Sequence, residues 1–275
     1  MISKIFHPCI ILKFFKFFNI YLIGDNMSNT AISFLLTIVA GFSTMIGTFL
    51  IFLKFKNVNK LLAGALSFAS SVMICISVVD LVPEGINLLK VNYSFLIVVL
   101  LSMLFLVFGI LMSMMVDYFF PSDDTKMKNG SLYKVGIISM IAIILHNIPE
   151  GIATFITASN DIKLGFSLAL AISLHNIPEG ISISVPIYYS TNSRLKALTY
   201  TFISAISEPF GAFITYLFLR PFINDTVLGL LYVFIAGIMF HISFCELFPK
   251  SKSYNYKFIT YLFFVVGFVF IFLFH

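Results

Sequence analysis

The sequence predicts an all-α integral membrane protein whose chain crosses the bilayer eight times. Hydrophobic residues make up 60% of the 275 residues and only 11% are charged, whereas about 25% of the residues in an average soluble domain are charged. The apolar residues fall into eight long runs, and a helix needs roughly 20 such residues to cross a bilayer. The runs also lack the period-two alternation of β-strands. Helices are therefore the spanning elements.

Short breaks separate the eight runs and carry turn-forming or charged residues. Examples are KFKNVNK after the first run and PSDDTKMKNGSLYK after the third. We predict transmembrane helices over about residues 31–53, 61–84, 94–117, 135–158, 164–187, 197–219, 227–247 and 258–274.

Lysine and arginine residues are distributed unevenly among the loops between these helices. The first, third, fifth and seventh loops hold 3, 3, 2 and 3 of them, whereas the second, fourth and sixth hold one each, namely Lys90, Lys163 and Arg220. Positively charged loops tend to stay in the cytoplasm. We therefore expect a multi-pass protein of the cell membrane with its odd-numbered loops in the cytoplasm and both termini extracytoplasmic.

The first 26 residues do not fit this scheme, because Lys4, Lys13 and Lys16 lie where few cations are expected. Met27, which is followed by SNTAISFLL, is a plausible alternative start. A processed leader and an interfacial segment are the other interpretations. We treat residues 1–26 as an N-terminal extension and residues 27–275 as a single membrane domain.

Several classes of protein are not indicated. The net charge of +5 comes from scattered lysines and arginines without a basic stripe, so nucleic-acid binding is not expected. No GxxxxGK[ST] motif occurs, which excludes ATP binding of that kind by this chain. Cys9, Cys75 and Cys245 have no paired spacing, so disulfides are not expected.

The chain repeats the seven residues HNIPEGI at positions 146–152 and 175–181, inside the fourth and fifth predicted helices. Residues three or four positions apart share one face of a helix. Each copy therefore places a histidine, an asparagine and a glutamate on one face: His146, Asn147, Glu150, His175, Asn176 and Glu179.

This doubled motif favours a metal site. Ionisable groups near the bilayer centre cost a few kcal/mol each and usually mark a binding site or a pathway. Imidazole nitrogen and carboxylate oxygen are ligands of Zn²⁺ and its neighbours. Pro149 and Pro178 also free two main-chain carbonyls, while Gly151 and Gly180 would let neighbouring helices approach closely. Hydrogen bonding between helices alone is the alternative, and the repetition argues against it.

Further polar residues lie in the second, sixth and seventh helices. Glu208, next to Pro209, could close the site from a third side. Pro249 follows the polar residues of the seventh helix as Pro83 follows those of the second, which suggests that these helices are counterparts. Core packing is the alternative for Met73. A cation path along these two helices would use Met73, Ser77, Asp80, Glu84, His241 and Glu246, with Cys245 on the face of His241.

These motifs resemble the ZIP (Zrt/Irt-like) family of metal-ion permeases, in particular its bacterial ZupT branch. The matching stretches are FASSVMICISVVDLVPE, HNIPEGIATF, HNIPEGISISVPIYYSTNSRLKAL and SEPFGA, in family order, and the resemblance covers about residues 27–275. It implies outer helix triplets related by inverted symmetry around helices four and five. It also implies metal import into the cytoplasm, no resident cofactor and, in many members, a homodimer.

The resemblance further implies a two-metal site. One metal would take His146, Glu150, His175 and Glu179, and the other would take Asn147, Asn176 and Glu208 while sharing Glu150 and Glu179 as bridges. The chain departs from the family in the loop after the third helix, which is often rich in histidine and here has Asp123 and Asp124. It also departs at Asp80, where glutamate is usual, and at Cys245, where a second acid is common.

Other functions stay open at this point. A divalent metal exporter would use the same ligands, because direction cannot be derived from spacing. An intramembrane metalloenzyme is less favoured, since no HExxH motif occurs. Zn²⁺ is the expected ion, and Fe²⁺, Mn²⁺, Co²⁺ and Cd²⁺ are alternatives because such ligands do not select one metal.

Overall fold

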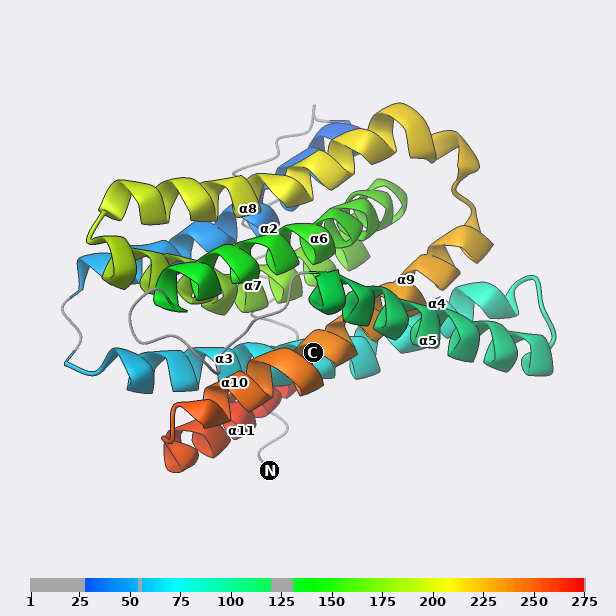
Figure 1. Cartoon of the computed structure of the whole chain (residues 1–275). Coiled ribbons are helices and arrows are strands. Elements are labelled where there is room, and N and C mark those ends of the chain that lie inside the picture. The colour runs from blue at the N-terminus through cyan, green and yellow to red at the C-terminus, as the bar shows by residue number, and fades with distance from the viewer. Residues whose placement is uncertain (1–27, 54–55, 120–130, 275) are drawn as a thin grey trace, which may run out of the picture.

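A computed structural model describes residues 28–53, 56–119 and 131–274 of the chain (Figure 1). The N-terminal extension and the loop that holds Asp123 and Asp124 lie outside these ranges. Within them the regular elements are all helices. The main ones are α2 (Asn29–Thr48), α3 (Val58–Ile76), α4 (Val82–Lys90), α5 (Phe95–Phe119), α6 (Ser131–Asn160), α7 (Ile162–Thr191), α8 (Arg194–Ile214), α9 (Asp225–His241), α10 (Phe248–Ser253) and α11 (Lys257–Phe274).

Each of the eight predicted transmembrane helices has a counterpart in the structure. Seven helices in the described part are long and apolar enough to cross a membrane, and the eighth prediction corresponds to the shorter apolar helix α11. The second span runs continuously through α3 and α4, and the seventh through α9 and α10. The prediction of an all-α membrane protein is therefore confirmed.

The second and seventh spans share a local irregularity. A π-helical turn, η4 (Ser77–Leu81), joins α3 to α4, and another, η7 (Ile242–Leu247), joins α9 to α10. Pro83 and Pro249 stand in the first turn of the helix that follows each π turn. Proline cannot donate to the carbonyl four residues before it, and π turns are one adjustment to that defect. The expected similarity of these two helices thus extends to their backbone.

The eight spans pack as two bundles (Figure 1). The motif bundle consists of α2, α6, α7 and α8, which all contact one another. The flanking bundle consists of α3 with α4, α5, α9 with α10, and α11. The main contacts between the bundles join α3 to α7 and α6 to α9. The HNIPEGI motifs therefore lie on the two helices through which the bundles meet.

The helix contacts follow the inverted relation that the family resemblance implies. Exchanging spans one to three with spans six to eight, and four with five, converts the α2–α7 contact into the α8–α6 contact. The same exchange converts α3–α11 into α9–α5, and α3–α7 into α9–α6. All six of these pairs are in extensive contact.

Two glycines of the repeated motif set the closest approaches within the motif bundle. A Cβ atom at Gly151 would lie 2.0 Å from the main-chain oxygen of Glu208 in α8, and one at Gly180 would lie 1.8 Å from that of Thr44 in α2. Any side chain at either position would separate the helices. The expectation that Gly151 and Gly180 permit close packing is confirmed.

Candidate metal centre

The two motif helices are joined by one of the shortest connections in the chain. Helix α6 ends at Asn160 and α7 begins at Ile162, with Asp161 between them as N-cap. The Oδ1 atom of Asp161 accepts hydrogen bonds from the main-chain N–H groups of Lys163 (2.8 Å) and Leu164 (3.1 Å). Such a cap stabilises the start of α7. The helices consequently run antiparallel, and their motifs lie opposite each other.

The histidine of each motif faces the glutamate of the other. Nε2 of His146 lies 3.0 Å from Oε1 of Glu179, and Nε2 of His175 lies 3.3 Å from Oε2 of Glu150. All four residues are at most 3% exposed. The two copies of the motif thus form a crossed pair of buried His–Glu contacts. Exchanging helices four and five, as in the inverted relation of the spans, converts one of these contacts into the other.

A third helix adds Glu208, which is fully buried in α8. Its Oε2 accepts a hydrogen bond from Nδ2 of Asn176 at 2.9 Å, and the same nitrogen donates to the main-chain oxygen of Ala40 in α2 at 2.9 Å. The predicted approach of Glu208 from a third side is therefore present. Its part in binding a metal stays a prediction.

Six of the seven expected ligands carry a buried polar atom without a hydrogen-bond partner. Leaving such an atom unsatisfied costs about 1–3 kcal/mol, so native proteins keep few of them. Most of these atoms here are oxygens, which accept hydrogen bonds or ligate cations. They are Asn147 Oδ1 and Nδ2, Glu150 Oε1, His175 Nδ1, Asn176 Oδ1, Glu179 Oε2 and Glu208 Oε1.

The residues are gathered but do not form a complete ligand shell. Among the described residues, no three His, Cys, Asp or Glu side chains are arranged to hold one ion. The histidines and glutamates bond to each other instead, and Asn147 makes no hydrogen bond with its side chain. Metal binding requires ligand atoms free of protons. A metal would therefore have to replace the His–Glu contacts, with rotation of the side chains.

The expected path residues of the second span run from the core to the surface. Met73 and Ser77 are fully buried, and the hydroxyl of Ser77 donates to the main-chain oxygen of Met73 at 2.8 Å. Met73 packs in the hydrophobic core. Asp80 and Glu84 follow on η4 and α4 and are partly exposed. Only the second half of this face therefore presents carboxylates outside the core.

The seventh span places its polar residues on different sides. His241 is buried, and its Nδ1 lies 2.9 Å from the hydroxyl of Ser113 in α5, within the flanking bundle. Cys245 is exposed. Glu246 is close enough to His146 to interact with it electrostatically. Glu246 thus lies near the motif bundle.

A small apolar cavity of about 10 Å³ adjoins Glu150 on the side toward the α6–α7 connection. Helices from both bundles contribute to it. About one helical turn from its lining residues Ala153 and Ile235, the hydroxyl groups of Thr157 in α6 and Tyr232 in α9 form a hydrogen bond. Apart from Glu150, its lining consists of Ile76, Leu81, Ala153, Leu168, Ile172, Ile235 and Met239.

Sequence reasoning missed the main-chain oxygen of Ala40 and the Tyr232–Thr157 contact. A main-chain oxygen has no sequence signal, because every residue has one. The neighbouring Gly41 was a hint that α2 packs closely at this point. A Cβ atom there would lie 2.6 Å from the main-chain oxygen of Ala205 in α8. The Tyr232–Thr157 pair joins residues 75 positions apart and had no signal in either helix.

Comparison with known proteins gives a consistent result. The family profile described as "ZIP Zinc transporter" matches residues 121–275. A relative from Clostridium perfringens is 36% identical over 264 residues, covering 84% of this chain and 90% of its own length. One from Oceanobacillus iheyensis is 38% identical (83% and 91% covered), and one from Streptococcus mutans is 39% identical (81% and 88% covered). Each of these relatives is named Zinc transporter ZupT.

Proposed function

The chain belongs to the ZIP family, and we propose on this premise that it imports Zn²⁺ into the cytoplasm. It is a multi-pass membrane transporter of divalent metal ions and not an enzyme. The metal is its substrate. The observation that carries the proposal is the crossed pair of buried His–Glu contacts with unpartnered carboxylate oxygens beside them. Fe²⁺, Mn²⁺, Co²⁺ and Cd²⁺ are further candidate substrates because the ligand types are shared.

We propose a site for two metals within the motif bundle. The first metal binds His146, His175 and the two motif glutamates. The second binds Asn147, Asn176 and Glu208 and shares Glu150 and Glu179 with the first. The burial of all these groups supports this assignment. The unpartnered oxygens on Asn147, Asn176 and Glu208 support it as well, since each could ligate a cation without losing a hydrogen bond.

We further propose that Asp80 and Glu84 receive the metal on the outer side and that Glu246 receives it on the inner side. The partial exposure of the first two and the proximity of Glu246 to His146 support this order. The positively charged odd-numbered loops support an arrangement with both termini outside the cytoplasm. We also propose that the chain assembles as a homodimer, and only its membership of the ZIP family supports this.

The test is elemental analysis of cells that express the chain, its His146→Ala variant, or its Ser173→Ala variant. Ser173 is the control, because it lies in α7 and its hydroxyl bonds only within that helix. We expect zinc to accumulate in cells with the wild type and Ser173→Ala, and not with His146→Ala at equal membrane abundance. Lower zinc than in cells without the protein would establish the exporter instead. Accumulation with His146→Ala would contradict the site.

The two-metal assignment is tested by Zn²⁺ titration of the purified protein, followed by isothermal titration calorimetry. We expect two Zn²⁺ per chain in the wild type and one in Glu208→Gln. A single Zn²⁺ in both proteins would contradict the second position while leaving transport intact.

A further inference from the structure

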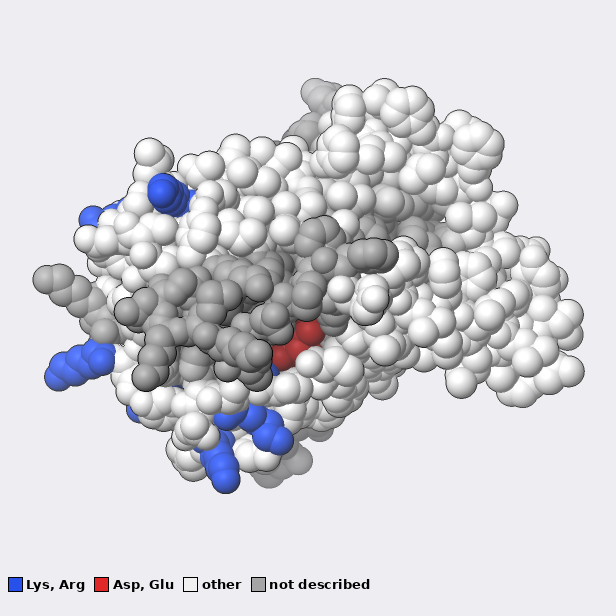
Figure 2. Space-filling model, in the orientation of Figure 1, with Lys and Arg blue, Asp and Glu red and all other residues white. Residues whose placement is uncertain are grey.

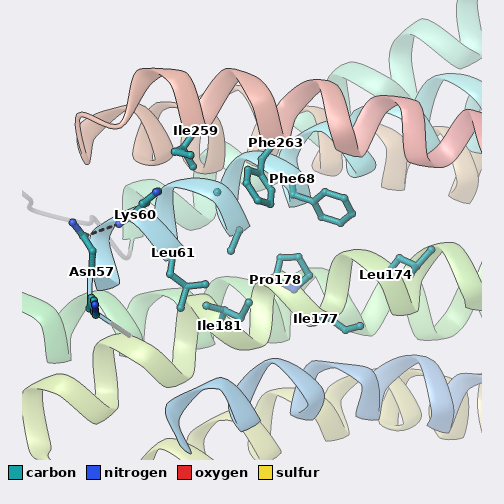
Figure 3. Close-up of a pocket in the computed structure, with 13 residues that line it drawn as sticks. Asn57, Lys60, Leu61, Phe68, Leu174, Ile177, Pro178, Ile181, Ile259 and Phe263 are labelled. Atoms are coloured by element: carbon teal, nitrogen blue, oxygen red, sulfur yellow. Dashed lines mark hydrogen bonds between the residues drawn. The ribbon is translucent and has the colours of Figure 1, made fainter. Parts of the chain in front are cut away.

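A groove of about 730 Å³ lies between the two bundles, on the face of α7 opposite the metal centre (Figure 3). Helices α3 and α11 of the flanking bundle form one wall, and α7 of the motif bundle forms the other. Its volume is within the range of about 300–1,000 Å³ that is typical of small-molecule sites. Its lining consists of Lys56, Asn57, Lys60, Leu61, Gly64, Ala65, Phe68, Leu174, Ile177, Pro178, Ile181, Ile259 and Phe263.

The groove is amphipathic along its length. Its polar groups stand together at one end, beside Asn57 and Lys60, while Leu174 marks the opposite end (Figure 3). The stretch between them presents only apolar side chains and small residues. A molecule that fits this shape has a long apolar part and one polar end. The surrounding bilayer consists of such molecules.

The polar end of the groove is positively charged. Lys56 and Lys60 are exposed, and neither forms an ion pair with any carboxylate in the described ranges. Asn57 holds this end in place: its Oδ1 caps α3 by accepting from the N–H of Lys60 at 3.0 Å, and its Nδ2 donates to the hydroxyl of Tyr256. Basic pockets between transmembrane helices bind the acidic headgroups of lipids.

We propose that this groove binds one anionic glycerophospholipid from the surrounding bilayer. Its phosphate lies between Lys56 and Lys60, and an acyl chain extends along α7 toward Leu174. A zwitterionic lipid fits the apolar stretch equally well, but its own cation opposes the two lysines. The charge at the groove end therefore selects the headgroup, whereas the apolar walls only admit the chain.

Such a lipid would contact α7 directly behind the metal centre. Ile177, Pro178 and Ile181 line the groove, while His175 and Glu179 project from the opposite face of the same turns. The lipid would also touch α3 and α11 over this length, beside the direct contact between α3 and α7. It would thus form part of the interface between the two bundles.

The chain has no tryptophan, so a single introduced one reports on its own surroundings. Phe263→Trp places the reporter in the groove wall. The control is Phe213→Trp, because Phe213 in α8 is 51% exposed and does not line the groove. Each protein is reconstituted into vesicles that contain phosphatidylglycerol and phosphatidylcholine at equal mole fraction. In one preparation the phosphatidylglycerol is brominated, and in the other the phosphatidylcholine is brominated. Bromine quenches tryptophan at short range. Both leaflets hold both lipids, so the orientation of the protein does not matter.

At Phe263→Trp, we expect the quenching to give a binding preference for phosphatidylglycerol over phosphatidylcholine of roughly fivefold or more. At Phe213→Trp the two lipids should quench about equally. In the Phe263→Trp background, Lys56→Gln with Lys60→Gln should reduce the preference to about onefold. Lys196→Gln, which removes a lysine outside the groove, should leave it unchanged. Equal quenching by the two lipids at Phe263→Trp, or a preference that survives the double substitution, would overturn the proposal. Transport is not measured, so the result is independent of the proposed function.

Discussion

Glu150 and Glu179 each give one oxygen to a histidine of the opposite helix and keep the other without a partner. If both glutamates bridge two metals, their loss affects both positions, whereas loss of Asn176 affects one. Outer-shell partners alone change metal affinity by roughly 10–100-fold. We expect Glu179→Ala to reduce the initial rate of Zn²⁺ uptake by at least roughly 100-fold and Asn176→Ala by roughly 10-fold. Uptake of labelled zinc by proteoliposomes measures both, and equal losses would contradict shared carboxylates.

The two motif asparagines differ in their hydrogen bonds, although they occupy equivalent places in the sequence. Asn147 has two unpartnered polar atoms, while Asn176 donates to Ala40 and Glu208. Without metal, Asn147→Leu should therefore keep or raise the free energy of unfolding, and Asn176→Leu should lower it by about 1–3 kcal/mol. Thermal unfolding in detergent with a chelator measures this difference. Equal destabilisation of the two variants would argue against the unpaired state of Asn147.

At the scale of helices, glycine controls how closely the motif bundle packs. Gly180→Ala would place a methyl group 1.8 Å from a main-chain oxygen of α2, which cannot move without the helix. We expect a loss of about 1–3 kcal/mol, the usual cost of overpacking. Gly64→Ala is the matched control, because its Cβ would meet the side chain of Phe263 at 3.3 Å. Thermal unfolding should separate the two variants, and equal midpoints would show that α2 adapts.

The helices themselves could be predicted from the sequence because a membrane span is a local property of composition. The faces of the two motifs could also be predicted, since helical periodicity fixes which residues share a side. The crossing of His146 to Glu179 and of His175 to Glu150 could not, because it depends on how two helices rotate against each other. Pro83 and Pro249 indicated that the second and seventh helices are counterparts, but not that a π turn precedes each proline. The contact of Tyr232 left no trace in composition or spacing, and for the contact of Ala40 only the neighbouring Gly41 was a hint.

For the whole molecule, the distribution of charge fixes the expected orientation (Figure 2). Blue lysine and arginine atoms gather at one end of the visible face, and the opposite end is largely white. Asn160 precedes α7 and Leu195 follows it, so the two residues lie at opposite ends of this span, and both are exposed. With Cys9, Cys75 and Cys245 replaced, Asn160→Cys should react with a membrane-impermeant thiol reagent in intact cells. Leu195→Cys should react only after lysis, and the reverse pattern would invert the topology.

Among the long apolar spans of the described residues, helix α5 of the flanking bundle exposes the largest share of its residues. Only 17% of the α5 span is buried within the chain, against 72% of the α7 span. Phe95, Leu96 and Leu100 on α5 are each at least 60% exposed. In a bilayer this surface faces acyl chains, whereas most of the α7 span packs against other helices of the chain. The bundle arrangement thus keeps the ionisable groups of the motif away from lipid.

The apolar cavity beside Glu150 also has an electrical consequence for the cell. About 10–15 Å³ is needed to hold one water molecule, so a cavity of about 10 Å³ cannot carry a file of them. In this conformation the cavity therefore offers no continuous chain of water molecules along which protons could cross this layer of the described residues. Vesicles containing the protein should therefore hold an imposed pH gradient as long as protein-free vesicles do, which a trapped pH dye can follow. A cell could keep many copies in its membrane without dissipating its proton-motive force.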